Sequence, residues 1–271
     1  MVIGSELTTG KAVRAACRSG AWTAPTAGLA AGSAQANLVI LPSDAAAEFR
    51  EFCQRNPKPC PLLEVTSPGC FEPVQLAAGA DLRTDLPRYR IFRDGKLADE
   101  RESIVELWQE DFVAFLLGCS FTFEHTLVEA GIPLRHLEQG RNVPMFRTNI
   151  PCQSAGRFSG TMVVSMRPLT PADAIRAVEL TSHFPQMHGS PVHLGFPQQI
   201  GIADLSRPDF GDAVPVHSNE FPVFWACGVT PQVVLEQAGL SLAITHAPGH
   251  MFVTDRTDEQ LLVGRAVAST E

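Results

Sequence analysis

The stretch from Arg141 to Cys152 holds the side chains best suited to binding a carboxylate. It contains Arg141, Arg147 and Asn149, and it is interrupted by two prolines. Each proline lacks a backbone N–H and restricts the residue before it, so we expect an irregular segment rather than a helix or a central strand. Guanidinium groups offer paired N–H donors that match the two oxygens of a carboxylate. The pattern therefore predicts a substrate-binding loop, with a buried connector whose arginines pair with structural acids as the alternative.

A second candidate site lies at Cys119 and Ser120, just before a predicted helix from Phe121 to Ala130. Ser120 is a suitable N-cap for this helix. Cys119 would lie beside the helix N-terminus, where free N–H groups and the helix dipole favour negative charge and lower the pKa of a thiol. The backbone N–H groups at Ser120 could also hold an oxyanion. Cys119 is thus a candidate nucleophile, and a small buried core residue is the competing interpretation.

Histidines gather in the C-terminal half of the chain. His246 and His250 are four residues apart, but the Pro-Gly pair between them rules out a helical zinc-binding arrangement. Histidine titrates near neutrality, so these two are candidates for general acid–base catalysis. His188, His193 and Thr230 are candidate substrate-binding residues. We expect no metal ion and no cofactor, because no acids stand at ligand spacing and no GxGxxG or GxxxxGK[ST] loop occurs.

The elements that must position these residues follow an α/β pattern. Asn37–Leu41 is a continuous apolar run, typical of a strand buried on both faces, and a helix is expected to begin at Ser43. The pair Asp94-Gly95 predicts a hairpin turn. Other segments are predicted from periodicity and caps: helices at Lys11–Arg18, Ile104–Leu117, Thr170–Ser182 and Thr230–Gly239, and strands at Ile132–Leu137, Thr161–Met166, Leu240–Thr245 and Met251–Thr254.

A length of 271 residues favours two domains. We predict an α/β fold in which a mixed sheet flanked by helices, residues 1–155 and 228–271, carries an inserted smaller α+β (β-α-β-β) domain, residues 156–227. In an open α/β sheet the helix starts at Ser43, Ser120 and Thr230 would lie near the carboxyl ends of strands, where ligands bind. One cleft is therefore expected to be lined by Arg147, Asn149, Cys119, His246 and His250.

The composition of the chain limits the classes of partner that the protein is expected to bind. The formal net charge of −8 argues against nucleic acid or an anionic membrane as the main partner, but not against a small carboxylate substrate. The hydrophobic share of 45% supplies a core and leaves material for a homo-oligomer interface. Seven cysteines without a CxxC pair, no secretory signal and no run long enough to span a bilayer favour a cytoplasmic protein. The residues from Val263 to Glu271 are expected to form a frayed tail.

Six longer strings are specific enough to compare with known families. They are Asn37–Pro42, Phe52–Pro61, Gly118–Phe121, Arg141–Cys152, Phe224–Pro231 and Thr245–Phe252. Together they resemble the D-glutamate cyclase-like family, whose bacterial members are usually labelled hydro-lyases, over nearly the whole chain. The resemblance implies a two-part α/β fold and lyase chemistry that removes water. The characterised vertebrate relative, which carries an additional domain, closes D-glutamate to 5-oxo-D-proline.

Lactam closure would need three things from the candidate residues. The α-carboxylate must be anchored, which suits Arg147 with Arg141 and Asn149 near it, and the ammonium must lose a proton, which suits His246 or His250. The side-chain carboxyl must become electrophilic, and N–H groups at Ser120 could hold the developing oxyanion. The alternatives are a metal-dependent hydro-lyase acting on another hydroxy or amino acid, and a non-catalytic carboxylate-binding protein.

Overall fold

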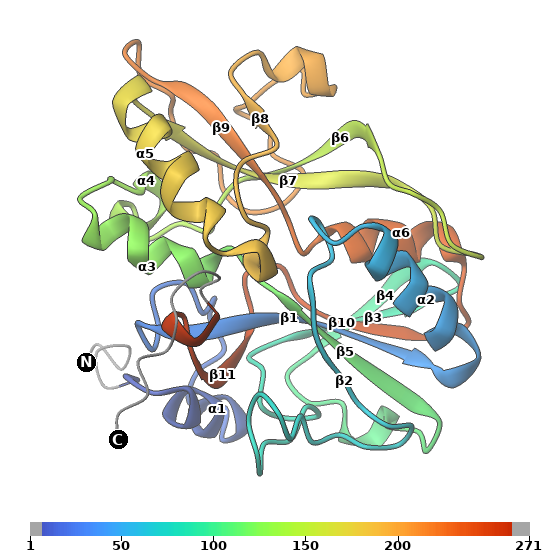
Figure 1. Cartoon of the computed structure of the whole chain (residues 1–271). Helices are drawn as coiled ribbons and strands as arrows, with labels where there is room; N and C mark the ends of the chain where they lie inside the picture. Colours follow the sequence, from blue (N-terminus) through green and yellow to red (C-terminus); the bar gives the residue numbers. More distant parts are fainter. Residues whose placement is uncertain (1–6, 262–271) are drawn as a thin grey trace, which may run out of the picture.

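Two antiparallel sheets dominate the computed structural model, which describes residues 7–261 (Figure 1). The first sheet has the order β2-β5-β1-β10-β3-β4, with β11 also paired to β1, and the second has the order β6-β7-β9-β8. The strands of the first sheet are β1 (Ser33–Pro42), β2 (Leu62–Val65), β3 (Tyr89–Arg93), β4 (Lys96–Arg101), β5 (Phe112–Gly118), β10 (Ala243–His246) and β11 (Phe252–Thr257). Those of the second are β6 (Met145–Pro151), β7 (Thr161–Leu169), β8 (His193–Leu194) and β9 (Phe221–Ala226).

Six α-helices occur among the described residues. They are α1 (Gly10–Arg18), α2 (Ser43–Arg55), α3 (Phe121–Glu129), α4 (Arg135–Glu138), α5 (Pro171–Ser182) and α6 (Thr230–Ala238). The helices predicted at Lys11–Arg18 and Thr170–Ser182 are confirmed, and the side chains of Thr9 and Thr170 cap their first turns. None of the helices in this part of the chain combines the length and the apolar character needed to cross a membrane. The predicted tail, Val263–Glu271, lies outside the described residues.

The first sheet is not the mixed sheet that we predicted, because all its strand pairs within residues 7–261 are antiparallel. β1 and β2 are both antiparallel to β5, which lies between them. In the β1–β5 pair Gly118 lies opposite Ala36, whereas Phe112 lies opposite Pro42. The helices that follow β1 and β5 therefore begin at opposite ends of the sheet, and the common carboxyl edge expected for Ser43 and Ser120 does not exist.

Two further secondary-structure predictions are wrong. Residues 112–117 of the segment Ile104–Leu117, predicted to be helical, instead belong to strand β5, which is buried at all seven positions. A segment that is apolar throughout has no period, so its sequence cannot distinguish a buried strand from a buried helix. The segment Ile132–Leu137, predicted to be a strand, instead leads into the short helix α4.

The predicted irregular loop around Arg147 is also wrong in part, because residues Met145–Pro151 form strand β6. β6 lies at the edge of the second sheet, where it pairs only with β7 among the described strands. Pro144 precedes the strand and Pro151 is its last residue, positions at which a missing N–H costs little. The two prolines thus permit an edge strand while forbidding a central one.

Helices cover both sheets. Phe49 of α2 and Val234 of α6 share one cluster with Phe115 of β5, so these two helices cover one face of the first sheet. α3 and α5 pack on the second sheet in a separate cluster around Trp225. After the second sheet is complete, β10 returns to the first sheet between β1 and β3. The domain boundaries at 155/156 and 227/228 stay a prediction, although β6, assigned to the first domain, belongs to the second sheet.

Candidate active site

The site begins with an interruption in the first sheet. β10 pairs with β1 at Val39 and Ile40, and β11 pairs with the same strand at Ala36 and Gln35. β10 and β11 therefore pair one after the other with the same side of β1, and residues 247–251 between them leave the sheet. The imidazole of His246 fills the gap, where its Nδ1 accepts a hydrogen bond from the backbone N–H of Leu38 at 3.1 Å.

The excursion is a tight turn whose sequence suits its geometry. The N–H of His250 donates to the carbonyl of Ala247 at 2.9 Å, which closes a turn with Pro248 and Gly249 at its centre. Gly249 has a φ of +83°, a conformation that glycine adopts without strain. The N–H of Ala247 donates to the carbonyl of Arg88 and so fastens the turn to the chain entering β3. The string His-Ala-Pro-Gly-His thus builds a rigid projection from the sheet.

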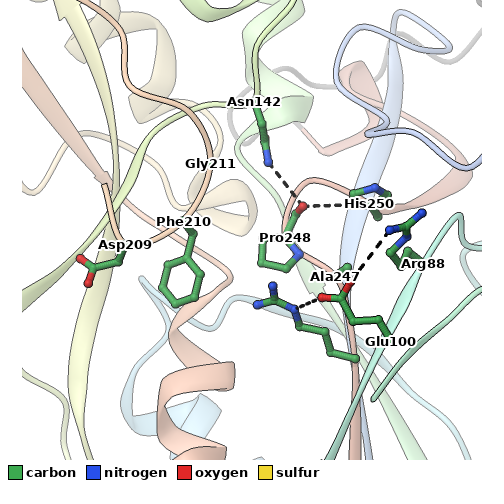
Figure 2. A pocket seen from close by; sticks show the side chains of 10 residues that line it. Arg88, Glu100, Asn142, Asp209, Phe210, Gly211, Ala247, Pro248 and His250 are labelled. Atoms are coloured by element: carbon green, nitrogen blue, oxygen red, sulfur yellow. Dashed lines mark hydrogen bonds and ion pairs between the residues drawn. The ribbon is translucent and has the colours of Figure 1, made fainter. Parts of the chain in front are cut away.

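A pocket of about 340 Å³ lies against this turn (Figure 2). On one side are the turn itself and the β3–β4 hairpin. On the other side are Asn142 and the segment Asp209–Gly211, both connected to the second sheet through Met145, whose N–H and carbonyl bond to Phe210. The pocket is lined by Arg88, Arg90, Glu100, Asn142, Asp209, Phe210, Gly211, Ala247, Pro248 and His250.

The pocket contains a guanidinium group with unused donors. Arg90 donates from Nε to Glu100 at 2.8 Å, which satisfies this carboxylate on one side. Arg88 approaches Glu100 and Glu102 only at 3.9 and 4.0 Å, too far for hydrogen bonds. Within residues 7–261 the Arg88 guanidinium therefore makes ion contacts but no hydrogen bond, and its paired N–H groups can take a carboxylate.

His250 is arranged as a base. Its Nδ1 lies 3.0 Å from the carbonyl oxygen of Pro248, which only accepts, so Nδ1 carries the proton and donates it. Nε2 then has a free lone pair. Burial lowers the pKa of His250, the cations Arg88 and Arg90 lower it further, and the Pro248 carbonyl and Glu100 oppose the change. The imidazole is thus neutral at pH 7 and able to accept a proton.

The same carbonyl of Pro248 orients Asn142. The Asn142 amide donates from Nδ2 to it at 3.4 Å (Figure 2). The backbone of Asn142 is held by Asp212, whose N–H donates to the Asn142 carbonyl and whose carboxylate accepts from the Asn142 N–H. The Oδ1 atom of Asn142 is buried and has no hydrogen-bond partner among the described residues.

Of the residues singled out from the sequence, His250 lies in this pocket and the others lie outside its lining. Cys119 is buried in an apolar cluster with Cys227, and burial raises the pKa of its thiol well above the usual value. The helix dipole does not produce a thiolate here, because the thiol is cut off from water. Ser120 is buried, and its hydroxyl accepts a hydrogen bond from Arg167 instead of capping α3.

The other histidines and Thr230 have partners within the protein. His246 lies beneath the turn, and burial lowers its pKa to about 4. His188 bonds the Lys58 carbonyl at 2.8 Å, and burial likewise lowers its pKa to about 4. His193 bonds the carbonyl of Phe196 at 3.2 Å. The Thr230 hydroxyl is buried and donates to the carbonyl of Cys227 at 2.7 Å.

The arginines of the predicted binding loop are also engaged. Arg147 forms an ion pair with both oxygens of Glu236 at 3.0 and 2.9 Å. Arg141 donates to the Ala213 carbonyl at 2.5 Å and lines a separate hollow of about 390 Å³. Asn149 is exposed on β6. The alternative interpretation, a connector whose arginines pair with structural acids, agrees with the ion pair of Arg147. The substrate-binding roles of Arg141, Arg147 and Asn149 stay predictions.

Sequence reasoning missed Arg88, Glu100, Asn142 and Asp209. The first two belong to a charged hairpin whose pattern is typical of a solvated edge. Asn142 stands in a string that did attract attention, but there the arginines drew the interpretation. No group of three or more His, Cys, Asp or Glu side chains in the described range could hold a metal ion.

A buried ionic cluster fastens α3 to the second sheet. Arg167 of β7 donates to Glu124 of α3 from Nε at 3.0 Å, to Ser165 at 3.0 Å and to Ser120 at 3.1 Å. His136 of α4 lies 3.0 Å from Glu124. The pKa of Glu124 is lowered to about 2, because the attraction of His136 and Arg167 outweighs the effect of burial. This cluster fixes the relative position of α3, α4 and β7.

Comparison with known proteins places the chain among named relatives. A family model described as D-glutamate cyclase matches residues 113–255. A protein from Stutzerimonas stutzeri with the printed name "Putative hydro-lyase" is 60% identical over 250 residues, which cover 92% of this chain and 94% of that protein. Proteins of the same description from Geobacillus kaustophilus and Bordetella pertussis are 59% and 58% identical, covering 93% and 96% of this chain and 95% and 94% of theirs. A solved nitrogen repressor-like protein from Methanococcus jannaschii aligns with a TM-score of 0.37 at 9% identity over 93% of this chain and 99% of its own.

Proposed function

The chain belongs to the D-glutamate cyclase family, and from this premise we propose that it is a hydro-lyase whose substrate is a small amino-acid carboxylate. We further propose that the reaction is closure of D-glutamate to 5-oxo-D-proline. The observation that carries the proposal is the pairing, in one pocket, of a guanidinium with unused donors and a neutral imidazole. An anchor for a carboxylate and a base for an ammonium are the two groups that lactam closure needs first.

The substrate is anchored by Arg88. A carboxylate of D-glutamate accepts two N–H bonds from its guanidinium, which the loosely placed Glu100 and Glu102 leave free. Arg90 stays paired with Glu100. Because Arg90 balances the charge of this carboxylate, the positive charge of Arg88 is left for the substrate. This role was expected for Arg147, but Arg147 already binds the carboxylate of Glu236.

The chemical step is driven by His250 and by proximity. Nε2 of His250 takes a proton from the substrate ammonium, and the freed amine lone pair attacks the carbon of the side-chain carboxyl group. The new C–N bond forms as a C–O bond breaks, and the two protons that the ammonium loses leave with that oxygen as water. His250 returns the first of these protons to the departing oxygen. Both reacting groups belong to one molecule, so orientation supplies much of the rate.

The direct test is a panel of amino acids and hydroxy acids incubated with the purified protein. D-glutamate, L-glutamate and four-carbon analogues are each followed by mass spectrometry for loss of the mass of one water. Release of 5-oxo-D-proline by the wild type, and its loss in His250→Gln, is the expected result. Loss of water only from a hydroxy acid, or activity abolished by a chelator and restored by a metal, would move the assignment to the metal-dependent alternative. Binding of D-glutamate without product would favour the carboxylate-binding alternative.

A further inference from the structure

The pocket contains a polar atom that the protein leaves unused. Oδ1 of Asn142 is buried and has no hydrogen-bond partner among residues 7–261, although the rest of the residue is well held. A buried acceptor without a donor costs free energy, so such atoms in native proteins call for an explanation. Asn142 lines the pocket beside Pro248 and His250 (Figure 2).

The orientation of this amide follows from its surroundings. The carbonyl of Pro248 only accepts hydrogen bonds, so the amide group that faces it must be the NH₂ group, and Oδ1 must face away. Asp212 holds the backbone of Asn142 from both sides. A Cβ at Gly249 would lie 2.5 Å from Nδ2 and 2.8 Å from Oδ1, so the absence of a side chain there lets the amide lie across the turn.

An unused acceptor calls for a ligand that donates. The neighbouring charges are compatible with a cationic donor, because Asp209 adds a carboxylate to a lining whose other carboxylate, Glu100, is already bonded by Arg90. Asn142 and His250 both donate to the carbonyl oxygen of Pro248. This shared hydrogen bond holds the two side chains near each other, and each keeps one free acceptor, Oδ1 of Asn142 and Nε2 of His250. A protonated amine has several N–H groups and can donate to both at once.

We propose that Oδ1 of Asn142 accepts a hydrogen bond from the amino group of the substrate and makes the pocket selective for amino acids over the same acids without an amine. The proposal rests on the proposed function, which supplies an amine-bearing carboxylate as the ligand. Asn142 positions the amine while His250 accepts its proton. The residue thereby distinguishes D-glutamate from glutarate, which has the same two carboxylates and no amino group.

The test compares these two ligands in Asn142→Ala. Dissociation constants are measured by calorimetry in the His250→Gln background, which prevents proton transfer during the titration. The substitution should weaken D-glutamate binding by about tenfold to a hundredfold, the range expected for a hydrogen bond to a charged group. Glutarate binding should change by less than about threefold, because its carboxylates do not donate to Oδ1. Asn219→Ala, an exposed position in the loop before β9, is the matched control.

The outcomes separate this inference from the proposed function. Equal weakening of both ligands, no weakening of either, or a protein in which neither ligand binds would overturn the role of Asn142. A wild type that binds D-glutamate in preference to glutarate but releases no water would remove the proposed function while leaving this role intact. The fold is monitored by thermal unfolding, and Asn142→Ala should unfold near the wild-type temperature because Asp212 bonds only to its backbone.

Discussion

Replacing Arg88 by methionine should remove most of the affinity for substrate while leaving the fold intact. Methionine keeps much of the volume of the arginine stem and loses the charge and all five N–H donors. In the unliganded protein Arg88 makes no hydrogen bond to the described residues, and its two ion contacts, at 3.9 and 4.0 Å, involve side chains that are 35% and 56% exposed. The substitution therefore takes little from the protein itself.

The size of the effect follows from these contacts. A bidentate guanidinium–carboxylate pair makes two charge-assisted hydrogen bonds, each worth about 1.5–3 kcal/mol. The Arg88 side chain is 39% exposed, so the lower end of that range applies, and we expect a total loss of about 3 kcal/mol. That loss corresponds to a decrease in kcat/KM of about a hundredfold. The free energy of unfolding should change by less than about 1 kcal/mol, the range for exposed ion pairs.

The assay is steady-state release of water from D-glutamate, with thermal unfolding measured on the same preparations. Because the carboxylate stays bound through ring closure, KM should carry most of the change and kcat little of it. Arg88→Lys should recover part of the affinity, since an ammonium keeps the charge but lacks the fork geometry. Arg101→Met is the matched control, because Arg101 pairs with Asp99 of the same strand, β4, and does not line the pocket.

The reasoning would be refuted by an Arg88→Met protein with wild-type kcat/KM. It would also be refuted if Arg101→Met lowered kcat/KM as much as Arg88→Met did, because the effect would then reflect the net charge of the hairpin. A kcat decrease at unchanged KM would place Arg88 at the developing oxyanion instead of at the bound carboxylate.

Three further predictions follow from the site and its surroundings. His250→Gln should lower kcat by about a hundredfold or more. In the wild type, kcat/KM should stay level as the pH falls to about 6.5 and decline only below it, because burial lowers the pKa of His250 and the active neutral form persists. A decline that begins above pH 6.5 would contradict this. Cys119→Ser should keep most of the rate, since the thiol is buried outside the pocket with a raised pKa, and a thioester trapped by hydroxylamine would show otherwise. Glu124→Gln should lower the free energy of unfolding in urea by about 3–5 kcal/mol, because Arg167 stays buried without its counter-charge; a loss under about 1 kcal/mol would argue against an ionic role for the cluster.

Local structure could be predicted wherever one short pattern determines it. Thr170 followed by Pro171 and Asp173 specifies a helix start by capping and by proline geometry, and the helix begins there. Asp94-Gly95 adopts positive φ angles at both residues, as its hairpin turn requires. The apolar run at Asn37–Leu41 forms the C-terminal half of β1. In each case the cause lies within a few residues, so the sequence was enough.

The candidate site could be predicted only in part. The sequence pointed to His250 and to the Pro-Gly turn beside it, because proline fixes φ and glycine permits positive φ whatever surrounds them. It also assigned the family through long strings, among them Thr245–Phe252. The sequence could not show which arginine side chain lacks a hydrogen-bonded carboxylate partner. Arg147 and Arg88 are equivalent as residue types, and they differ because Glu236 reaches the first while only distant, exposed carboxylates approach the second.

Caps, turns and clear periodic patterns in the sequence therefore account for the elements that they mark, for the family and for the turn that carries His250. The strand conformation of β5, the antiparallel pairing of the first sheet and the meeting of Arg88, Asn142 and His250 in one pocket emerge only from the folded arrangement. The physical reason is that backbone conformation depends on near neighbours, whereas pairing of charges and burial of a single amide oxygen depend on which distant segments meet. Packing of two sheets brings those segments together, and no pattern within one segment records the partner that it will face.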